Sequence, residues 1–373
     1  MTRKFLVMLV IASLSGCGGR EENSIGERDE LENIKDLLSA APRSVVDLDA
    51  SDSSTVYPEM VIGGISDSQR DEVYLASPVG TFSCAESLYV CDRLAQGIIV
   101  VEKKSGRIVR KIGRKGHGPT EFIAPYQIAG NDSIILVYDF GNSRVQLFSH
   151  LFKYIASLPA SFPPVGTSIG ASNDKLIIRG NFADTTLISV RSSSVPFPRL
   201  RSFLPRIVPN GKQPSAKNNI RFSVNRSGWI CVGYPSTPFV FVFDPSGRLS
   251  STIELRGNLV ERLRGPVKIQ ASGGIPVRVL IFALLIQENL DIILASGSEI
   301  LFMKRRGEFY EMSRRYLLRH RNAQIESEST MIVSSHILLD EGKLYVCNPL
   351  DSHVEIFSLE QAKSTSISSS QPQ

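Results

Sequence analysis

The sequence has few of the residues that most often build metal sites. Its 373 residues contain five histidines and five cysteines. No two histidines have the HxxxH or HExxH spacing with which one helix presents two zinc ligands. The histidines are His117, His150, His320, His336 and His353. A metal site would have to be assembled from distant parts of the chain, and we expect no cofactor.

Long apolar runs are also scarce. The run at residues 5–12 follows Arg3 and Lys4, and it is far shorter than the roughly 20 residues that span a bilayer as a helix. A basic start followed by a short apolar core is typical of a secretory signal. The sequence therefore predicts export, with a signal peptide at residues 1–16.

Neither sign of charge dominates the chain. There are 42 Lys and Arg residues against 37 Asp and Glu residues, which gives a net charge of +5. Removal of Arg3 and Lys4 with the signal lowers this charge to +3. Proteins that bind nucleic acid concentrate basic residues on one face, so we expect no nucleic acid partner.

Beyond residue 56 no segment keeps a helical period over three turns. The chain instead repeats short, apolar, β-branched runs broken by Gly, Asn, Asp and Pro, a pattern typical of strands. Six copies of this unit are recognisable. They begin at Leu88, Ile135, Leu176, Trp229, Ile292 and Leu344. Their spacing of 41 to 63 residues fits one four-stranded propeller blade each.

The predicted fold is therefore all-β, a six-bladed β-propeller at residues 54–362. We expect a strand within residues 56–75 to complete the last blade, and a buried strand pair in the fifth blade at residues 275–286. Residues 17–53 are polar and predict a flexible tether with one short amphipathic helix around Ile34. Residues 363–373 predict a disordered tail.

Four cysteines remain beyond the signal region: Cys84, Cys91, Cys231 and Cys347. In an exported protein they permit three disulfide pairings. Cys91, Cys231 and Cys347, however, occupy similar places in three separate repeats. A small apolar filler would be placed in this way, so we interpret these three as buried free thiols.

The signal ends at Leu14, Ser15, Gly16 and Cys17, which resembles the lipobox of bacterial lipoproteins. The resemblance implies that Cys17 carries two or three acyl chains, palmitate included, and anchors the protein to a membrane. The alternative is an ordinary signal with a chance cysteine. Glu21 and Glu22 resemble the surface-export signals of Bacteroidetes lipoproteins. This likeness implies an outer-membrane location at the cell surface, with the periplasmic face as the alternative.

Two further segments carry a family resemblance. Residues 138–148 resemble an NHL repeat, whose blades carry Asp, Asn and Arg in the turn between the second and third strands. Residues 113–122 resemble a segment of the six-bladed β-propeller lipoproteins of Bacteroidetes. The matching residues are Gly116, Gly118, Pro119, Glu121 and Phe122.

The glycine-rich segment is the main candidate for ligand binding, because its basic side chains would attract an anion. The candidate residues are Arg114, Lys115, His117, Glu121 and Arg144. The alternative is a solvated connection between blades, anchored by Phe122. A second candidate binding face is the long insert at residues 192–219, which is rich in Arg, Lys and Pro.

These features predict a lipid-anchored, monomeric propeller that acts as a binding or scaffold protein, because rigid blades with variable loops suit recognition. The expected partners are a membrane, through Cys17, and a glycan, a peptide or an outer-membrane transporter complex. The resemblance to NHL propellers implies an alternative function. It is a metal-dependent hydrolase or lyase with its site in the central channel.

Overall fold

The computed structural model describes most of the chain from residue 34 to residue 359. The described residues are 34–64, 73–162, 166–181, 184–206, 218–235, 237–258, 260–261, 267–268, 276–277, 280–319, 336–349 and 351–359. The predicted signal, Cys17 and the predicted tail lie outside them.

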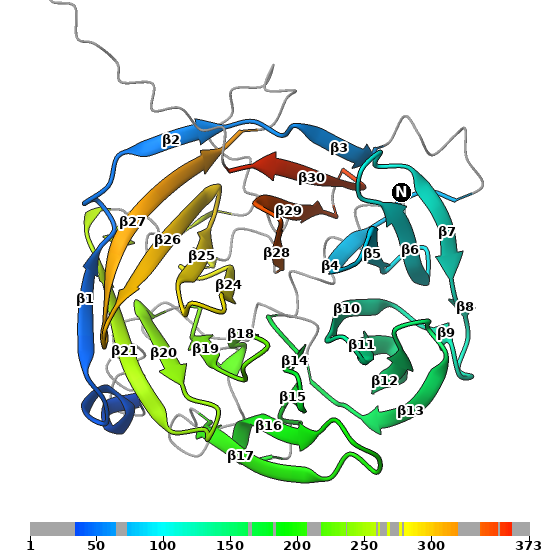
Figure 1. Ribbon diagram of the computed structural model, residues 1–373, viewed down its shortest axis with the longest axis horizontal. Coiled ribbons are helices and arrows are strands. Elements are labelled where there is room, and N and C mark those ends of the chain that lie inside the picture. The colour runs from blue at the N-terminus through cyan, green and yellow to red at the C-terminus, as the bar shows by residue number, and fades with distance from the viewer. Residues whose placement is uncertain are drawn as a thin grey trace, which may run out of the picture.

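Six β-sheets are arranged around a central axis (Figure 1). Blade 1 contains β4 (Pro78–Cys84), β5 (Ser87–Asp92), β6 (Gly97–Glu102) and β7 (Ile108–Ile112). Blade 2 contains β10 (Pro125–Gly130), β11 (Ile134–Asp139), β12 (Arg144–Ser149) and β13 (Tyr154–Pro159). Blade 3 contains β14 (Ile169–Ala171), β15 (Lys175–Arg179), β16 (Thr186–Ser192) and β17 (Arg199–Pro205).

Blade 4 contains β18 (Arg221–Val224), β19 (Ile230–Gly233), β20 (Phe239–Phe243) and β21 (Leu249–Arg256). Blade 5 contains β24 (Ala283–Ile286), β25 (Ile292–Ser296), β26 (Glu299–Arg306) and β27 (Phe309–Leu318). Blade 6 contains β28 (Ile337–Asp340), β29 (Lys343–Asn348) and β30 (His353–Ser358). Neighbouring strands within each blade are antiparallel. The prediction of an all-β, six-bladed propeller is confirmed.

The N-terminal part of the described chain runs around the outside of three consecutive blades (Figure 1). β1 (Arg43–Asp47) adds in parallel to β21, and β2 (Ser53–Val56) adds in parallel to β27. β3 (Met60–Gly63) pairs with β30 in the antiparallel sense and supplies the fourth strand of blade 6. The predicted closing strand within residues 56–75 is therefore confirmed.

The segment just before β1 also packs on the ring. Residues 34–39 form a short helix, as predicted around Ile34, and the Ile34 side chain is buried in the core shared by blades 3 and 4. Residues 34–39 and 43–53 lie within the segment expected to be a tether, residues 17–53, yet they pack on the propeller. We refer to residues 34–63 as the N-terminal arm.

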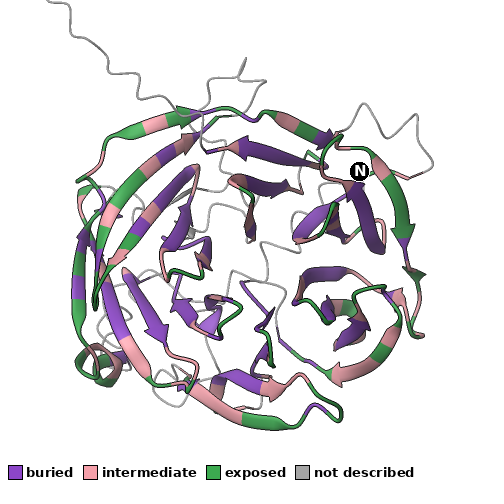
Figure 2. Cartoon of the chain, in the orientation of Figure 1, coloured by how far each residue is buried: buried purple, intermediate pink, exposed green. Residues whose placement is uncertain are grey.

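The core lies between adjacent blades, so the middle strands are covered on both faces (Figure 2). β11 and β20 are buried along their whole length. The sequence of a strand that is buried on both faces is a continuous apolar run, rather than an alternation of apolar and polar residues. Outer strands such as β27 alternate between exposed and buried residues. This difference explains why the middle strands gave the clearest sequence repeats.

One sequence expectation about strands is wrong. Only one strand of blade 5, β24, falls within residues 275–286, whereas β23 (Pro276–Val277) pairs with β22 (Val267–Lys268) in a separate two-stranded sheet. The segment at residues 192–219, predicted as an insert, contains β17, the outer strand of blade 3, so residues 199–205 belong to the sheet, and a binding role for the segment stays a prediction. Residues 207–217 of it lie outside the described residues. None of the described helices is long and apolar enough to cross a membrane.

The interpretation of the cysteines as free thiols is confirmed. Cys91, Cys231 and Cys347 are buried in the second strands of blades 1, 4 and 6, and Cys84 is half-buried; none of the four forms a disulfide. Burial raises the pKa of the Cys231 thiol to about 12 and raises the pKa of the Cys91 and Cys347 thiols as well. Because the thiolate is the reactive form, these three thiols should be inert.

A short treatment of the folded protein with a maleimide is therefore expected to modify Cys84 and to spare Cys91, Cys231 and Cys347. Peptide mass spectrometry would measure the fraction modified at each position. The urea-unfolded chain, in which all four should react, is the control. Modification of Cys231 in the folded protein at the rate of Cys84 would contradict the buried placement.

Candidate functional site

The glycine-rich segment connects blade 1 to blade 2. It contains two short strands, β8 (Arg114–Lys115) and β9 (Glu121–Phe122), which pair in parallel. The Phe122 side chain is fully buried in the core of blades 1 and 2. Gly113 has a φ of +83°, and a Cβ atom there would lie 2.4 Å from the Phe122 ring. Only glycine fits this position, so the backbone turns tightly around the buried phenylalanine.

Glu121 fixes the tip of this segment. Its carboxylate accepts a hydrogen bond from the Gly118 N–H at 2.9 Å and forms an ion pair with Arg114, with 2.7 Å between Oε1 and Nη2. The Gly118 hydrogen bond and the Arg114 guanidinium lower the pKa of the Glu121 carboxyl. A Cβ atom on Gly116 would lie 2.2 Å from Glu121 Oε2. The glycines therefore allow the loop to close over this carboxylate.

Arg144, from β12, reaches back to the same loop. It donates hydrogen bonds to the carbonyl oxygens of His117, Gly118 and Glu121 at 2.8 to 2.9 Å. Its Nε also donates to Oδ2 of Asp139 at 3.0 Å. All three guanidinium nitrogens are thus used to hold the loop on blade 2.

The structure brings the five predicted site residues together. His117 Nδ1 lies 2.7 Å from Asn142 Oδ1, and the side chains of Arg114, Lys115 and His117 are exposed. Arg144 and Glu121 carry the loop's own hydrogen bonds. This network accounts for the motif as a connection between blades. Contact of the exposed basic side chains with a ligand stays a prediction.

Asp139 organises this network, and the sequence analysis did not single it out as a site residue. The side chain is fully buried at the end of β11. Its Oδ1 accepts from the Ile123 N–H at 2.8 Å, and its Oδ2 accepts from Asn142, Arg144 and Gln146 at 2.7 to 3.2 Å. The sequence signal that could have identified Asp139 was its position in the NHL-like pattern at residues 138–148.

A second polar cluster lies between blades 3 and 4. Arg179 ends β15 and Arg221 begins β18, and their side chains are 3% and 6% exposed. Arg179 Nη2 donates to Asn219 Oδ1 at 2.8 Å, while Arg221 Nη1 donates to the carbonyl oxygen of the same asparagine at 3.0 Å. Arg179 also bonds the Asn218 carbonyl, and Arg221 Nε bonds the Phe282 carbonyl at 2.6 Å. We call Arg179 and Arg221 the guanidinium pair.

The guanidinium pair places two like charges close together in the interior. Burial, together with the neighbouring Arg221 charge, lowers the pKa of Arg179 to about 9, and burial lowers the pKa of Arg221 to about 10. Both groups remain protonated at neutral pH.

Ser168 lies opposite Arg179 across the first two strands of blade 3. The Arg179 N–H donates to the Ser168 carbonyl at 2.8 Å, which continues the pairing of β14 with β15. Ser168 is also the centre of a Gly-x-Ser-x-Gly sequence at residues 166–170. In hydrolases such a serine stands on a turn from a strand into a helix. Here it leads into β14, so the segment lacks that arrangement.

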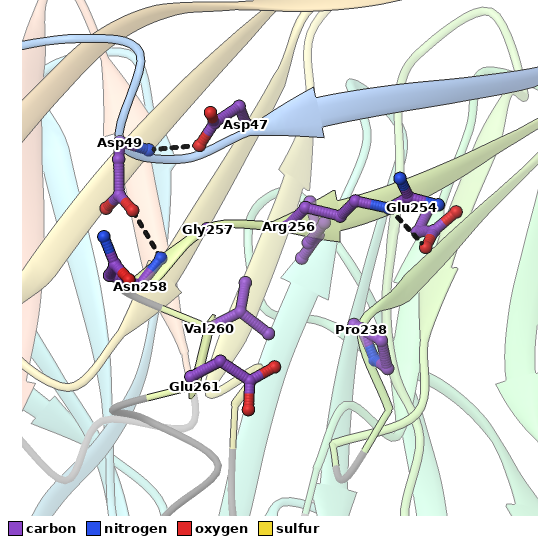
Figure 3. A pocket seen from close by; sticks show the side chains of 10 residues that line it. Asp47, Asp49, Pro238, Glu254, Arg256, Gly257, Asn258, Val260 and Glu261 are labelled. Atoms are coloured by element: carbon purple, nitrogen blue, oxygen red, sulfur yellow. Dashed lines mark hydrogen bonds and ion pairs between the residues drawn. The ribbon is translucent and has the colours of Figure 1, made fainter.

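An open cavity of about 520 Å³ lies where the N-terminal arm passes from blade 4 to blade 5 (Figure 3). Its carboxylates hold the arm in place. Asp49 accepts a hydrogen bond from the Asn258 N–H, and Asp47 accepts from the Asp49 N–H at 2.9 Å. Among the residues that the structure describes, no three His, Cys, Asp or Glu side chains lie close enough to hold a metal ion.

Comparisons with known families and solved structures agree with the six-bladed propeller fold. Residues 71–167 match the family described as 6-bladed beta-propeller. No curated protein sequence matches the chain. The structure of U3-55K is similar with a TM-score of 0.51 at 10% identity, over 77% of this chain and 97% of that one.

Two other solved structures are less similar. A Bacteroides fragilis protein described as exported gives a TM-score of 0.46 at 14% identity, over 73% of this chain and 80% of that one. Virginiamycin B lyase from Staphylococcus aureus gives 0.45 at 8% identity, over 80% and 98%. At such identities the similarity shows the fold alone.

Proposed function

We propose that this six-bladed propeller is exported, acylated at Cys17 and held at the outer membrane, facing the cell surface. There it acts as a binding or scaffold module for a glycan, a peptide or another envelope protein, and not as an enzyme. The lipobox-like residues before Cys17 support the anchoring, and the rigid ring of blades supports the binding role.

The anchoring proposal is supported by the place where the N-terminal arm joins the ring. Residues 34–39 pack at the outer wall beside β1, and β1 to β3 then follow the rim (Figure 1). Cys17 precedes Ile34 by 17 residues, a length of chain that spans at most about 60 Å when extended. A lipid on Cys17 would therefore tether the ring to the membrane through its outer wall, within about 60 Å of the bilayer.

The Cys17→Ala variant is expected to move from the membrane fraction to the soluble fraction. Each buried CH₂ group of an acyl chain contributes about 0.8 kcal/mol, so two chains anchor a protein stably in the bilayer. Cell fractionation followed by detergent phase partition would measure the change. Cys84→Ala, which removes a cysteine but not the lipidation site, is the matched control. A Cys17→Ala protein that stays with the membrane would contradict anchoring at this residue.

The binding role is tested by affinity purification of the tagged full-length protein from gently solubilised outer membranes. We expect a stoichiometric transporter or glycan-binding partner that disappears with Cys17→Ala. Recovery of the propeller alone would contradict an accessory role in a complex. Protease accessibility of intact cells would separate the surface-exposed orientation from the periplasmic one.

A further inference from the structure

The fourth residue of each repeat is buried in the second strand of its blade. These residues are Cys91, Tyr138, Arg179, Val232, Ala295 and Cys347. Val232 packs toward the preceding blade, whereas Ala295 and Cys347 pack toward the following one. Five of the six side chains are uncharged, and Arg179 alone brings a charge. A buried charge costs free energy unless partners compensate it, so Arg179 differs from the packing residues at the other five positions.

Arg221 adds a second buried positive charge, and its Nη2 group is an available hydrogen-bond donor. Its two hydrogen bonds use Nε and Nη1, and both acceptors are backbone carbonyl oxygens. Within the described part of the chain, Arg221 Nη2 has no acceptor. Gly166 makes room for this side chain, because a Cβ atom there would lie 2.5 Å from Arg221 Nη1. The backbone therefore approaches the guanidinium closely without covering its remaining donor.

Ser168 supplies an independent observation at the same place. Its side chain is fully buried, and its hydroxyl has no hydrogen-bond partner among the described residues. Directly opposite residues of an antiparallel pair project on the same face of the sheet, so this hydroxyl lies beside the Arg179 side chain. The preceding residue, Thr167, bonds the Ile220 carbonyl through its N–H at 3.2 Å. Ser168 and Arg221 therefore belong to neighbouring segments.

We propose that Arg179, Arg221 and Ser168 form a binding site for an oxyanion between blades 3 and 4. The inference rests on the proposed binding function and names its ligand class: a carboxylate, phosphate or sulfate group, free or part of a larger molecule. A guanidinium group presents a planar fork of N–H donors that fits two oxygens of such a group. The serine hydroxyl adds one more donor, and a bound oxyanion would accept from this hydroxyl and from Arg221 Nη2.

The site can be tested with acetate, inorganic phosphate and sulfate as probes. Each is added to the full-length protein in detergent, at an ionic strength held constant with chloride, and thermal unfolding is followed. We expect one probe to stabilise the protein saturably, with the ratio of folded to unfolded protein rising about 100-fold at 100 times Kd. A response to acetate identifies a carboxylate ligand, and a response to phosphate or sulfate identifies a tetrahedral one. No saturable response to any probe would overturn the proposal.

Substitution of Arg221, which provides the available donor, distinguishes binding at this site from binding to other basic surfaces. Arg221→Gln is expected to weaken binding of the responding probe roughly 10- to 150-fold, the loss for a hydrogen bond to a charged group. Arg314→Gln, on the exposed side of β27, is the matched control and should leave affinity unchanged. Wild-type affinity in Arg221→Gln would overturn the assignment.

A second variant covers the case in which Arg221→Gln does not fold. Ser168→Asp places a carboxylate beside the guanidinium pair, so it should abolish the response to the probe while the protein remains folded. A folded Ser168→Asp protein with wild-type affinity would refute the site. These titrations do not depend on the lipid, so a failed oxyanion site and a failed membrane anchor give different results.

Discussion

Replacement of Asp139 by alanine is expected to lower the free energy of unfolding by about 3–5 kcal/mol, the usual result of removing one partner of a buried ion pair. The carboxylate is fully buried and pairs with Arg144 at 3.0 Å. It also accepts from the Ile123 N–H and from Asn142 and Gln146. Alanine would leave a half-buried cation and several donors without their acceptor.

Urea unfolding of the full-length protein, followed by far-UV circular dichroism, would measure this loss of stability. Asp132→Ala is the matched control. Asp132 lies in the same blade but is 76% exposed, and its ion pair with Arg226 has a 3.7 Å separation. Its removal should change stability by no more than about 0.5 kcal/mol. Similar losses in the two variants would show that Asp139 does not organise the connection between blades 1 and 2.

The blades could be predicted from the sequence because each is built from strands that are neighbours in the chain. Residues 88–92 and 135–139 share an apolar run that ends in Asp, because most of their side chains are buried between blades. The second and third strands are apolar in every blade, so their spacing reveals the repeat. β24 is a short inner strand that follows the separate β22–β23 pair in the chain, and the apolar run at residues 275–286 did not show whether it held one strand or two.

The N-terminal arm was harder to recognise. β1 has alternate exposed and buried residues over only five positions, and β2 is shorter still. Such segments carry little periodic signal. They form strands because they pair with the outer edges of blades 4 and 5. Those edges lie about 210 residues later in the chain for β1 and about 260 residues later for β2. Polar composition alone therefore indicated a tether.

The contacts of the candidate site residues were also hard to predict, because they join segments that are distant in the sequence. The glycine-rich segment and Arg144 were predicted as one site, and the structure brings them together. Their hydrogen bonds could not be assigned, because the partners depend on how blade 2 packs against the loop. The guanidinium pair was missed because Arg179 and Arg221 are 42 residues apart in different blades. The only sequence signal was a charge at a repeat position that is elsewhere uncharged.

Closure of the ring depends on β3, so Ile62→Ala is expected to lower the free energy of unfolding by about 2–5 kcal/mol. Ile62 is 3% exposed and packs in a core cluster with residues of both blade 6 and blade 1. Alanine would leave a cavity at the junction of the last and first blades. The surrounding strands are fixed by their own hydrogen bonds and can collapse into that cavity only in part.

Val61 gives a control on the same strand, because its side chain points to the opposite face and is 40% exposed. Val61→Ala should change stability by no more than about 0.5 kcal/mol, while β3 keeps its pairing with β30. Urea unfolding of both variants would separate the contribution of side-chain packing from that of strand pairing. A cost for Ile62→Ala no greater than for Val61→Ala would mean that β3 closes the ring through its backbone alone. A much larger cost at Ile62 would show that the first and last blades are joined by a shared core.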